Sequence, residues 1–150
     1  MPIRSLREML ITHEGVRRKP YDDKTGRTLR PSHTLQGRLT IGVGRNLTDR
    51  GLTQSEVNYL LDNDIKKATS GAADYGWFHR LNEARQAVCI SMVFNCGARG
   101  WSTFKKTHLA LSEGRYEDAS VELLDSRYAE TVGDRALHLA EILRTGQWLD

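Results

Sequence analysis

Apolar residues recur every three or four positions along the first part of the chain, which is the spacing of one face of an α-helix. The residues on this face are Ile3, Leu6, Met9 and Leu10. Glu14 follows Leu10 by one turn, so its carboxylate should lie at the edge of the apolar face, where partial burial favours the protonated acid. Gly15 has the backbone freedom that commonly ends a helix. The pattern therefore predicts a helix that ends at Glu14 and presents a proton donor there.

Two short segments after this helix alternate in the way that β-strands do. The first is Tyr21 to Asp23, which runs into turn-forming residues, and the second is Leu39 to Gly44, which alternates apolar and small residues. A hairpin made from these segments would carry Asp23 and Thr40 back towards Glu14. Two carboxylates in different surroundings titrate apart, so Glu14 and Asp23 are candidates for an acid and a base that operate at one pH.

The connection between these two segments, Lys24 to Leu39, is long and basic. It contains Pro and Gly and lacks a helical period, so we expect an extended hairpin or lip. At its start, Asp22 competes with Asp23 for the role of base. Adjacent residues on a strand face opposite sides, so only one of the two carboxylates should face the site.

The remainder of the chain has the period of α-helices. Thr53-Gln54-Ser55-Glu56 has the form of a capping box, and the helix that it opens should continue to about Ser70. Further helices are expected at residues 82–96, 102–114 and 116–124, and after a cap at Asp134. The helix at residues 82–96 is apolar enough to be the core helix of the larger part of the molecule.

Composition and charge limit the class of function. A chain of 150 residues with a net charge of +3 forms one domain, or two small lobes that share a helix. The charge favours an anionic partner, yet Lys and Arg are scattered, so an extended nucleic-acid track is not expected. No apolar run approaches the length of a membrane span, and the N-terminus lacks a secretory core, so this form should accumulate in the cytoplasm.

The spacing of cysteine and histidine gives no sign of a metal site. Cys89 and Cys96 lie seven residues apart in a predicted helix, roughly 10 Å along its axis, which is too far for a disulfide. They should be free thiols that pack as small apolar groups. Paired ligand spacing is lacking, so neither a metal nor another cofactor is expected.

The order of these motifs resembles the phage-type lysozymes, glycoside hydrolase family 24. On the N-terminal side the resemblance lies in Glu14-Gly15, in Tyr21 followed two positions later by Asp23, and in Thr40-Ile41-Gly42-Val43-Gly44. In the C-terminal half it continues with Met92-Val93-Phe94-Asn95 and Gly97, Arg127-Tyr128, Asp134-Arg135-Ala136 and Arg144-Thr145-Gly146-Gln147-Trp148. One short motif is weak, whereas an ordered set over nearly the whole chain is specific.

The resemblance implies an α+β, mostly α-helical, lysozyme-like fold with two lobes. Residues 15–52 would form a small lobe that contains a β-hairpin or sheet, and residues 53–73 a long connecting helix. Residues 1–14 and 74–150 would form a helical lobe. The connection at Lys24 to Leu39 is longer than in compact members of the family, so the shape of the cleft entrance should differ.

The activity implied by the resemblance is hydrolysis of the β-1,4 bond between N-acetylmuramic acid and N-acetylglucosamine in peptidoglycan. Glu14 would protonate the leaving oxygen. Asp23 and Thr40 would activate and position a water on the opposite face of the sugar, which gives inversion. Inverting glycosidases hold their carboxyl groups about 6.5 to 9.5 Å apart and retaining ones about 5 to 5.5 Å, a distance that a sequence does not supply.

Several other positions acquire roles from the resemblance. Arg135 aligns with an arginine that pairs with the catalytic glutamate. Arg45 and Asp64 stand where the family has a histidine and an acid, so we expect an ion pair between them. The expected substrate contacts are Tyr21, Phe94, Thr107 and Glu122. Glu122 departs from the neutral amide often found at its position, which leaves its role open.

The resemblance also implies a phage endolysin that acts as a monomer on the peptidoglycan of the bacterial wall during host cell lysis. It would accumulate in the host cytoplasm and reach the periplasm and wall after release by a separate holin-type protein. Two alternatives stay open. One is a lytic transglycosylase, which cuts the same bond without water, and the other is a non-catalytic basic helical domain that binds nucleic acid or wall polymer.

Overall fold

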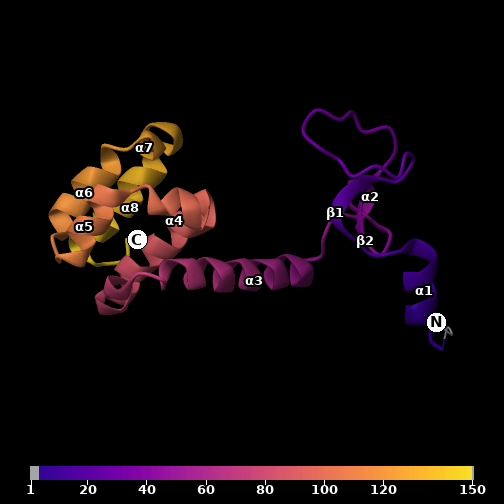
Figure 1. Ribbon diagram of the computed structural model, residues 1–150, viewed down its shortest axis with the longest axis horizontal. Helices are drawn as coiled ribbons and strands as arrows, with labels where there is room; N and C mark the ends of the chain where they lie inside the picture. The colour runs from indigo at the N-terminus through magenta and orange to yellow at the C-terminus, as the bar shows by residue number, and fades with distance from the viewer. Residues whose placement is uncertain (1–3, 150) are drawn as a thin grey trace. The chain divides into compact units, whose positions relative to one another are not determined.

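The computed structural model describes residues 4–149, so Ile3 of the predicted apolar face lies outside the described residues. The fold is α+β and mostly helical, with a small antiparallel sheet near the N-terminus (Figure 1), which confirms the expected fold class. Contacts between residues divide the chain into two compact units, Met1–Asn58 and Tyr59–Asp150. The predicted assignment of residues 1–14 to the helical lobe stays a prediction.

The N-terminal unit begins with helix α1 (Leu6–Glu14). The Ser5 hydroxyl accepts a hydrogen bond from the Glu8 amide at 3.1 Å and so caps the first turn. Gly15 has a φ of 74° and donates its amide to the Ile11 carbonyl at 2.9 Å, which closes the last turn. The predicted end of this helix at Glu14 is confirmed.

A three-stranded antiparallel sheet follows, in the order β1 (Arg17–Asp22), β2 (Leu39–Gly42) and β3 (Arg45–Asn46). Tyr21 is paired with Thr40 across β1 and β2. The predicted hairpin is therefore confirmed, although β1 starts earlier than Tyr21 and ends one residue before Asp23. Because Asp23 follows β1 and Thr40 is the second residue of β2, both lie at the same end of this strand pair.

The connection between β1 and β2 first turns back along β1. Thr28 forms an isolated antiparallel bridge with Tyr21, and the Leu29 amide donates to the Pro20 carbonyl at 3.0 Å. Figure 1 shows this connection as the long excursion between the two strands. The bridge lies along β1, which is an edge strand of the sheet, so it limits unpaired backbone there.

A one-turn helix α2 (Leu47–Arg50), which was not among the expected helices, follows β3. Asn46 caps it by accepting a hydrogen bond from the Asp49 amide at 3.0 Å. The next helix, α3 (Gln54–Ala72), opens with the predicted capping box, which is confirmed. The Thr53 amide donates to Glu56 at 2.8 Å and the Glu56 amide donates to the Thr53 hydroxyl at 3.2 Å.

The C-terminal unit is helical throughout its described part. After the end of α3 come the 3₁₀ helix η1 (Gly76–Arg80) and the helices α4 (Glu83–Ser102), α5 (Lys105–Ser112), α6 (Tyr116–Leu124), α7 (Arg127–Val132) and α8 (Asp134–Thr145). No helix within residues 4–149 combines the length and the apolar character needed to cross a bilayer.

The helices of this unit differ from the expected ones in several places. The core helix was expected to end at residue 96, but α4 continues to Ser102 across a kink at which Gly97 has φ 76° and ψ 164°. Helix α7 was not expected at all. Asp134 is the first residue of α8, and the cap position is occupied by Gly133, whose φ of 57° turns the chain between α7 and α8.

The core of the C-terminal unit forms around α4, as predicted. Val88, Cys89, Met92 and Trp101 are almost completely buried. They share one apolar cluster with residues of α6 and α8, including Leu123, Ala140 and Leu143. Both cysteines are free thiols, as expected, and burial raises the pKa of Cys89 to about 12.

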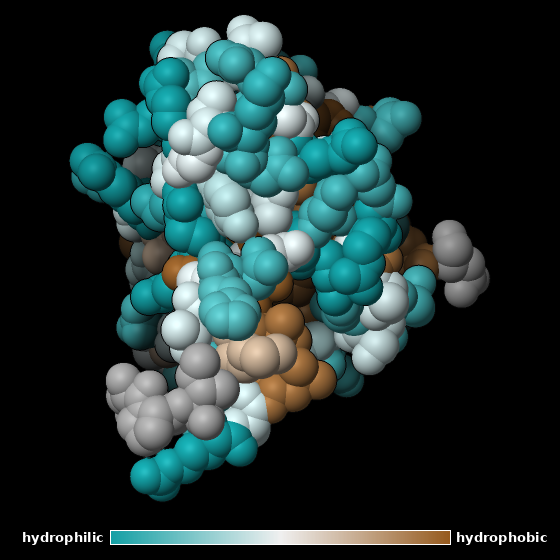
Figure 2. Space-filling view, turned by 90° about the vertical axis from the view of Figure 1, so that its right-hand side faces the viewer, coloured by the Kyte–Doolittle hydropathy of each residue, from teal (hydrophilic) through white to brown (hydrophobic). Residues whose placement is uncertain are grey.

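The apolar face of α1 is not covered within its own unit. Leu6 is 67% exposed and Leu10 is 44% exposed, and no residue of α1 is buried. The partial burial expected for Glu14 is therefore not supplied by the N-terminal unit, in which this residue is exposed. Figure 2 shows a face of the molecule that is mostly hydrophilic, with hydrophobic side chains exposed in a smaller area.

Candidate active site

Glu14, the predicted proton donor, lies against the turn between β2 and β3. A Cβ atom added to Gly44 would lie 2.8 Å from Oε2 of Glu14, which is too close for any real side chain. Gly44 also has a φ of 65°, a conformation that side chains rarely adopt. The second glycine of Gly42-Val43-Gly44 therefore allows the backbone of the sheet to approach the carboxylate, and this turn brings Glu14 to the sheet.

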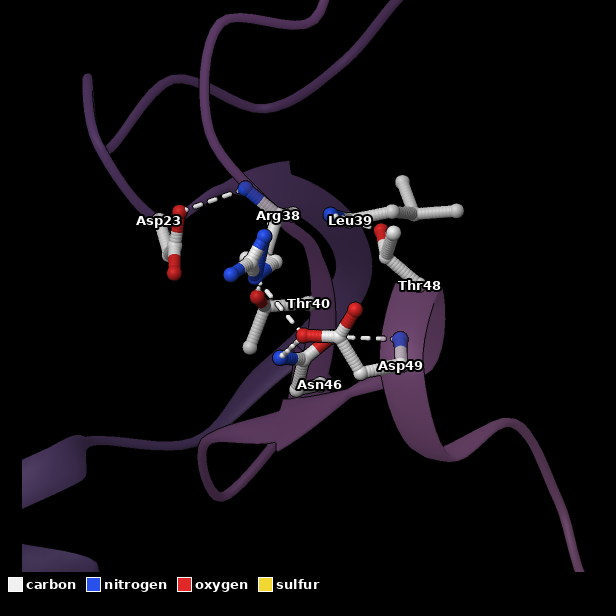
Figure 3. Close-up of polar contacts among 7 residues, drawn as sticks. All are labelled: Asp23, Arg38, Leu39, Thr40, Asn46, Thr48 and Asp49. Carbon is white, nitrogen blue, oxygen red and sulfur yellow. Dashed lines mark hydrogen bonds and ion pairs between the residues drawn. The ribbon is translucent and has the colours of Figure 1, made fainter.

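Asp23 and Thr40 are joined by the backbone of Arg38 (Figure 3). The Arg38 amide donates to Oδ1 of Asp23 at 2.6 Å, and the Asp23 amide donates to the Arg38 carbonyl at 3.1 Å. The same carbonyl accepts the hydroxyl hydrogen of Thr40 at 3.0 Å. The structure thus brings together two of the three predicted catalytic residues through one residue that the sequence did not single out.

Asp22 and Asp23 have opposite surroundings. Asp22 is 1% exposed, and its carboxylate accepts hydrogen bonds from the amides of Lys24 (2.9 Å), Thr25 (3.4 Å), Gln36 (2.7 Å) and Gly37 (3.0 Å). The hydrogen bond from Gln36, supported by the other three, holds the pKa of Asp22 below its usual range although burial acts in the opposite direction. Asp23 is exposed. Of the two carboxylates, only that of Asp23 is open to a substrate or a water.

The side chain of Arg38 is held by α2 (Figure 3). Its Nε atom lies 2.7 Å from Oδ2 of Asp49, and the amide group of Asn46 donates to the same oxygen at 2.8 Å. The Thr48 hydroxyl accepts the Leu39 amide at 2.8 Å. These contacts fix the chain on both sides of Arg38. An Asn with an Asp three residues later is a helix-start signature, so the sequence contained the signal for this support.

Arg45 has a different partner from the one expected. Its two terminal nitrogens donate to the carboxylate of Glu56 at 2.6 and 2.5 Å, and one of them also reaches the Gly51 carbonyl at 3.3 Å. The expected pair with Asp64 is therefore corrected to a pair with Glu56. The reason is the capping box, which turns Glu56 back over the start of α3. Arg45, helped by the amide of Thr53, lowers the pKa of Glu56 to about 2.

Phe94 lies at a groove in the C-terminal unit and does not belong to the core. Its side chain is 49% exposed, and it lines a groove of about 380 Å³ between α3 and α4. Asp64 and Lys67 of α3 line the same groove. An exposed aromatic ring beside charged and polar groups is suited to packing against a sugar ring.

Thr107 and Glu122 line a second groove in this unit, of about 470 Å³, formed by α5, α6 and the start of α7. Phe104 and Tyr128 also line this groove, together with charged side chains of both signs. Thr107 is almost fully buried. The structure therefore brings these two predicted substrate contacts into one groove, while Phe94 lines another.

Arg135 and Tyr21 have contacts within their own units. A terminal nitrogen of Arg135 donates to the Ser91 hydroxyl at 3.2 Å, and the arginine is otherwise exposed. The guanidinium of Arg17 lies 4.2 Å from the centre of the Tyr21 ring, so one face of this ring is covered. The expected pairing of Arg135 with Glu14 stays a prediction.

Comparison with known proteins matches the chain to lysozymes and to a phage protein. The model of the phage lysozyme family matches residues 11–140. The chain is 24% identical to the probable T4-type lysozyme 2 of Dictyostelium discoideum and 22% identical to the probable T4-type lysozyme 1 of the same organism, with 96% of each chain covered in both alignments. It is 26% identical to the pre-baseplate central spike protein Gp5 of Enterobacteria phage T4, where 97% of this chain aligns with 28% of that protein.

Proposed function

The chain belongs to the phage lysozyme family and is a peptidoglycan-degrading glycoside hydrolase, and from this premise we propose that it cleaves the β-1,4 bond between N-acetylmuramic acid and N-acetylglucosamine by inversion. The observation that carries the proposal is the linkage of Asp23 and Thr40 through the backbone of Arg38. This linkage fixes the position of the proposed base, Asp23, relative to the Thr40 hydroxyl, as the activation of a single water by both groups requires.

Glu14 is the general acid. In the described part of the N-terminal unit its carboxyl group accepts no hydrogen bond, so the acid is free to engage the glycosidic oxygen. The proton of Glu14 passes to that oxygen as the bond to the anomeric carbon breaks. A general acid must lie within hydrogen-bond reach of the leaving oxygen, and the glycine at position 44 keeps one side of the carboxylate clear of side chains.

Asp23 is the general base. Its Oδ1 atom is held by the Arg38 amide, which leaves Oδ2 to accept a hydrogen from the attacking water. Thr40 gives its own hydrogen to the Arg38 carbonyl, so its oxygen keeps its lone pairs to accept the second hydrogen of that water. The water oxygen bonds to the anomeric carbon and one of its protons passes to Asp23. Glu14 is reprotonated and Asp23 deprotonated by solvent before the next turnover.

Matched amide variants test these roles. Glu14→Gln and Asp23→Asn should each lower the release of reducing ends from purified peptidoglycan by about 10²- to 10⁴-fold, because each removes a proton-transfer group without changing shape. Asp62→Asn, an exposed acid of α3, is the control and should keep wild-type turnover. If Glu14→Gln keeps full activity, Glu14 is not the acid.

Product analysis separates hydrolysis from the transglycosylase alternative. Mass spectrometry of the released muropeptides should give products that contain one added water, because the proposed base activates water. Products that end in an anhydro sugar would contradict the proposed mechanism. Proton NMR of the first sugar released should show inverted anomeric configuration, and retained configuration would assign Asp23 to a nucleophile instead.

The substrate-binding residues are proposed on the same basis. Phe94 presents an exposed ring to a pyranose, and Thr107 and Glu122 contact the substrate from the groove that they share. Tyr21 contributes the ring face that Arg17 leaves free. Arg135 keeps Glu14 oriented. Phe94→Ala should raise KM more than it lowers kcat, and Arg135→Ala should lower kcat more than it raises KM.

We assign the protein to the lysis of a bacterial host as a monomeric endolysin that a separate holin-type protein releases from the cytoplasm. A second role is favoured by the match to a central spike protein, of which this chain covers 28%. In that role the same hydrolase would be a component of a phage particle. Antibody detection in purified particles and in the soluble lysate distinguishes the two roles.

A further inference from the structure

The loop between β1 and β2 is closed at both of its ends on one carboxylate. Two amides at its start, those of Lys24 and Thr25, and two at its end, those of Gln36 and Gly37, donate to Asp22. Asp22 itself is 1% exposed. Hydrogen bonds from amides to an ionised and buried carboxylate are stronger than those between neutral groups, so Asp22 holds the two ends of the loop together.

This loop has no apolar core of its own. Its interior encloses a hollow of about 210 Å³ lined mainly by polar side chains, and Leu29 is the one apolar residue among those that line it. Burial of apolar surface therefore contributes little to the order of the loop. The loop is ordered instead by the carboxylate of Asp22, which binds the amide of Gln36, fourteen positions away in the sequence.

Gly37 lies between the carboxylates of Asp22 and Asp23. A Cβ atom at this position would lie 2.2 Å from Oδ1 of Asp23, 2.9 Å from Oδ1 of Asp22 and 2.7 Å from the Cβ atom of Lys24. No side chain fits there. The amide that follows Gly37 in the chain, that of Arg38, is the one that holds Oδ1 of Asp23 at 2.6 Å.

We propose that Asp22 and Gly37 are positioning residues for the hydrolytic reaction, an inference that rests on the role proposed above for Asp23. Asp22 holds the backbone at residues 36 and 37, and Gly37 permits the close approach that puts the Arg38 amide on Asp23. The Arg38 carbonyl in turn holds Thr40. The geometry of the base and of the water-binding hydroxyl therefore depends on a carboxylate that never touches the substrate.

Asp22→Asn and Gly37→Ala test this inference, with Thr34→Ala as the control. An asparagine keeps the size of Asp22 but replaces one acceptor oxygen with a donor, which cannot accept a backbone amide. An alanine at position 37 overlaps Oδ1 of Asp23. Thr34 is an exposed residue of the same loop, and its side chain makes no hydrogen bond in the described structure.

Kinetics on soluble peptidoglycan fragments and amide hydrogen exchange are measured together. Both variants should lower kcat by about tenfold or more, because a displacement of the base by 1 Å is sufficient for such a loss. KM should stay within about twofold, because the sugar-binding groups are unchanged. In Asp22→Asn the amides of Gln36, Gly37 and Arg38 should exchange faster by about tenfold or more. Thr34→Ala should match the wild type in all three measurements.

Two results with the aspartate variants would overturn the inference, and they differ from each other. If Asp22→Asn speeds exchange but keeps wild-type kcat, while Asp23→Asn is inactive, then loop order does not position the base and the proposed function stands. If Asp23→Asn keeps wild-type turnover, the proposed role of Asp23 fails, and the inference fails with it. Should Asp22→Asn not fold, Gly37→Ala decides by the same kinetic readout, with unchanged kcat as the contrary result.

Discussion

His108 makes the stability of the C-terminal unit sensitive to mild acid. Its ring is 9% exposed and lies among three aromatic rings, with centroid distances of 4.3 Å to Trp101, 4.5 Å to Tyr75 and 5.4 Å to Trp77. Within residues 4–149 its Nε2 atom has no hydrogen-bond partner. Desolvation lowers the pKa of His108 from 6.5 to about 4, and a backbone hydrogen bond to Trp101 opposes this shift in part.

The sign of the effect follows from the two protonation states. In the unfolded chain His108 takes up a proton near pH 6.5, whereas in the folded protein it stays neutral to about pH 4. The unfolded state therefore gains stability from proton binding as the pH falls through this window. The whole shift corresponds to roughly 3 kcal/mol, of which about 2 kcal/mol is lost between pH 7 and pH 4.5.

Urea unfolding followed by far-UV circular dichroism at these two pH values measures the effect. His108→Phe removes the titrating group and keeps an aromatic ring. Both proteins should lose free energy of unfolding between the two pH values, and the loss in the variant should be smaller by about 2 kcal/mol. Carboxylates titrate in both proteins, so the comparison removes their contribution. Leu111→Ala, on the same helix, removes buried carbon without a titrating group and should lower stability equally at both pH values.

Equal losses of free energy in the wild type and in His108→Phe would refute this reasoning. Such a result would mean that the ring takes up its proton in the folded state as readily as in the unfolded state. A second substitution, His108→Gln, guards against strain from the larger phenylalanine ring. Both substitutions should reduce the acid sensitivity, whatever their effect on stability at pH 7.

Three other predictions follow from the described contacts. Glu56→Gln should lower Tm at neutral pH. The difference in Tm from the wild type should shrink as the pH falls from 4.5 towards 2, because protonation of Glu56 then breaks the same ion pair in the wild type. A difference in Tm that stays constant with pH in calorimetry would contradict this. The thiol of Cys89 should react with a disulfide reagent only as fast as the protein unfolds, because the residue is fully buried and the same burial raises its pKa to about 12, and rapid labelling of the folded protein would be the contrary result. Gly44→Ala should lower turnover by about tenfold or more, because the added Cβ displaces Glu14. Gly42→Ala is the control, since Gly42 has a similar φ but its Cβ would meet nothing within 4 Å, so this variant measures backbone strain alone. Equal losses of turnover in the two variants would refute the contact with Glu14.

The parts of the fold that depend on neighbouring residues were predictable from the sequence. Gly15 ends α1, and Thr53 with Glu56 forms the capping box of α3, because each signal acts within one turn of helix. Helix α2 was missed although Asn46 and Asp49 have the spacing of a cap. A single turn has too few residues for a hydrophobic period, so only its capping residues, Asn46 and Gly51, could have indicated it.

The parts that depend on distant residues were not predictable. The expected partner of Arg45 was wrong because Arg45 pairs with Glu56 across eleven residues, and the capping box turns Glu56 towards it. Strand alternation correctly indicated that Asp22 and Asp23 have different surroundings, but two of the four amides that donate to Asp22 come from the far end of the loop. The tight position of Gly37 likewise results from the fold, since its backbone conformation gives no reason for a glycine.

The way in which the loop at residues 24–37 is closed has a consequence for protein engineering. Its far turn, where the His33 amide donates to the Arg30 carbonyl at 2.9 Å, contains the exposed residues Pro31 and Ser32. Closing a longer loop adds little entropic cost, about 0.6 kcal/mol for each doubling of length. A peptide tag or a wall-binding module inserted between Pro31 and Ser32 should therefore leave unchanged the hydrogen bonds that join the two ends of the loop to Asp22. This turn is thus a site for attaching new specificity to the enzyme.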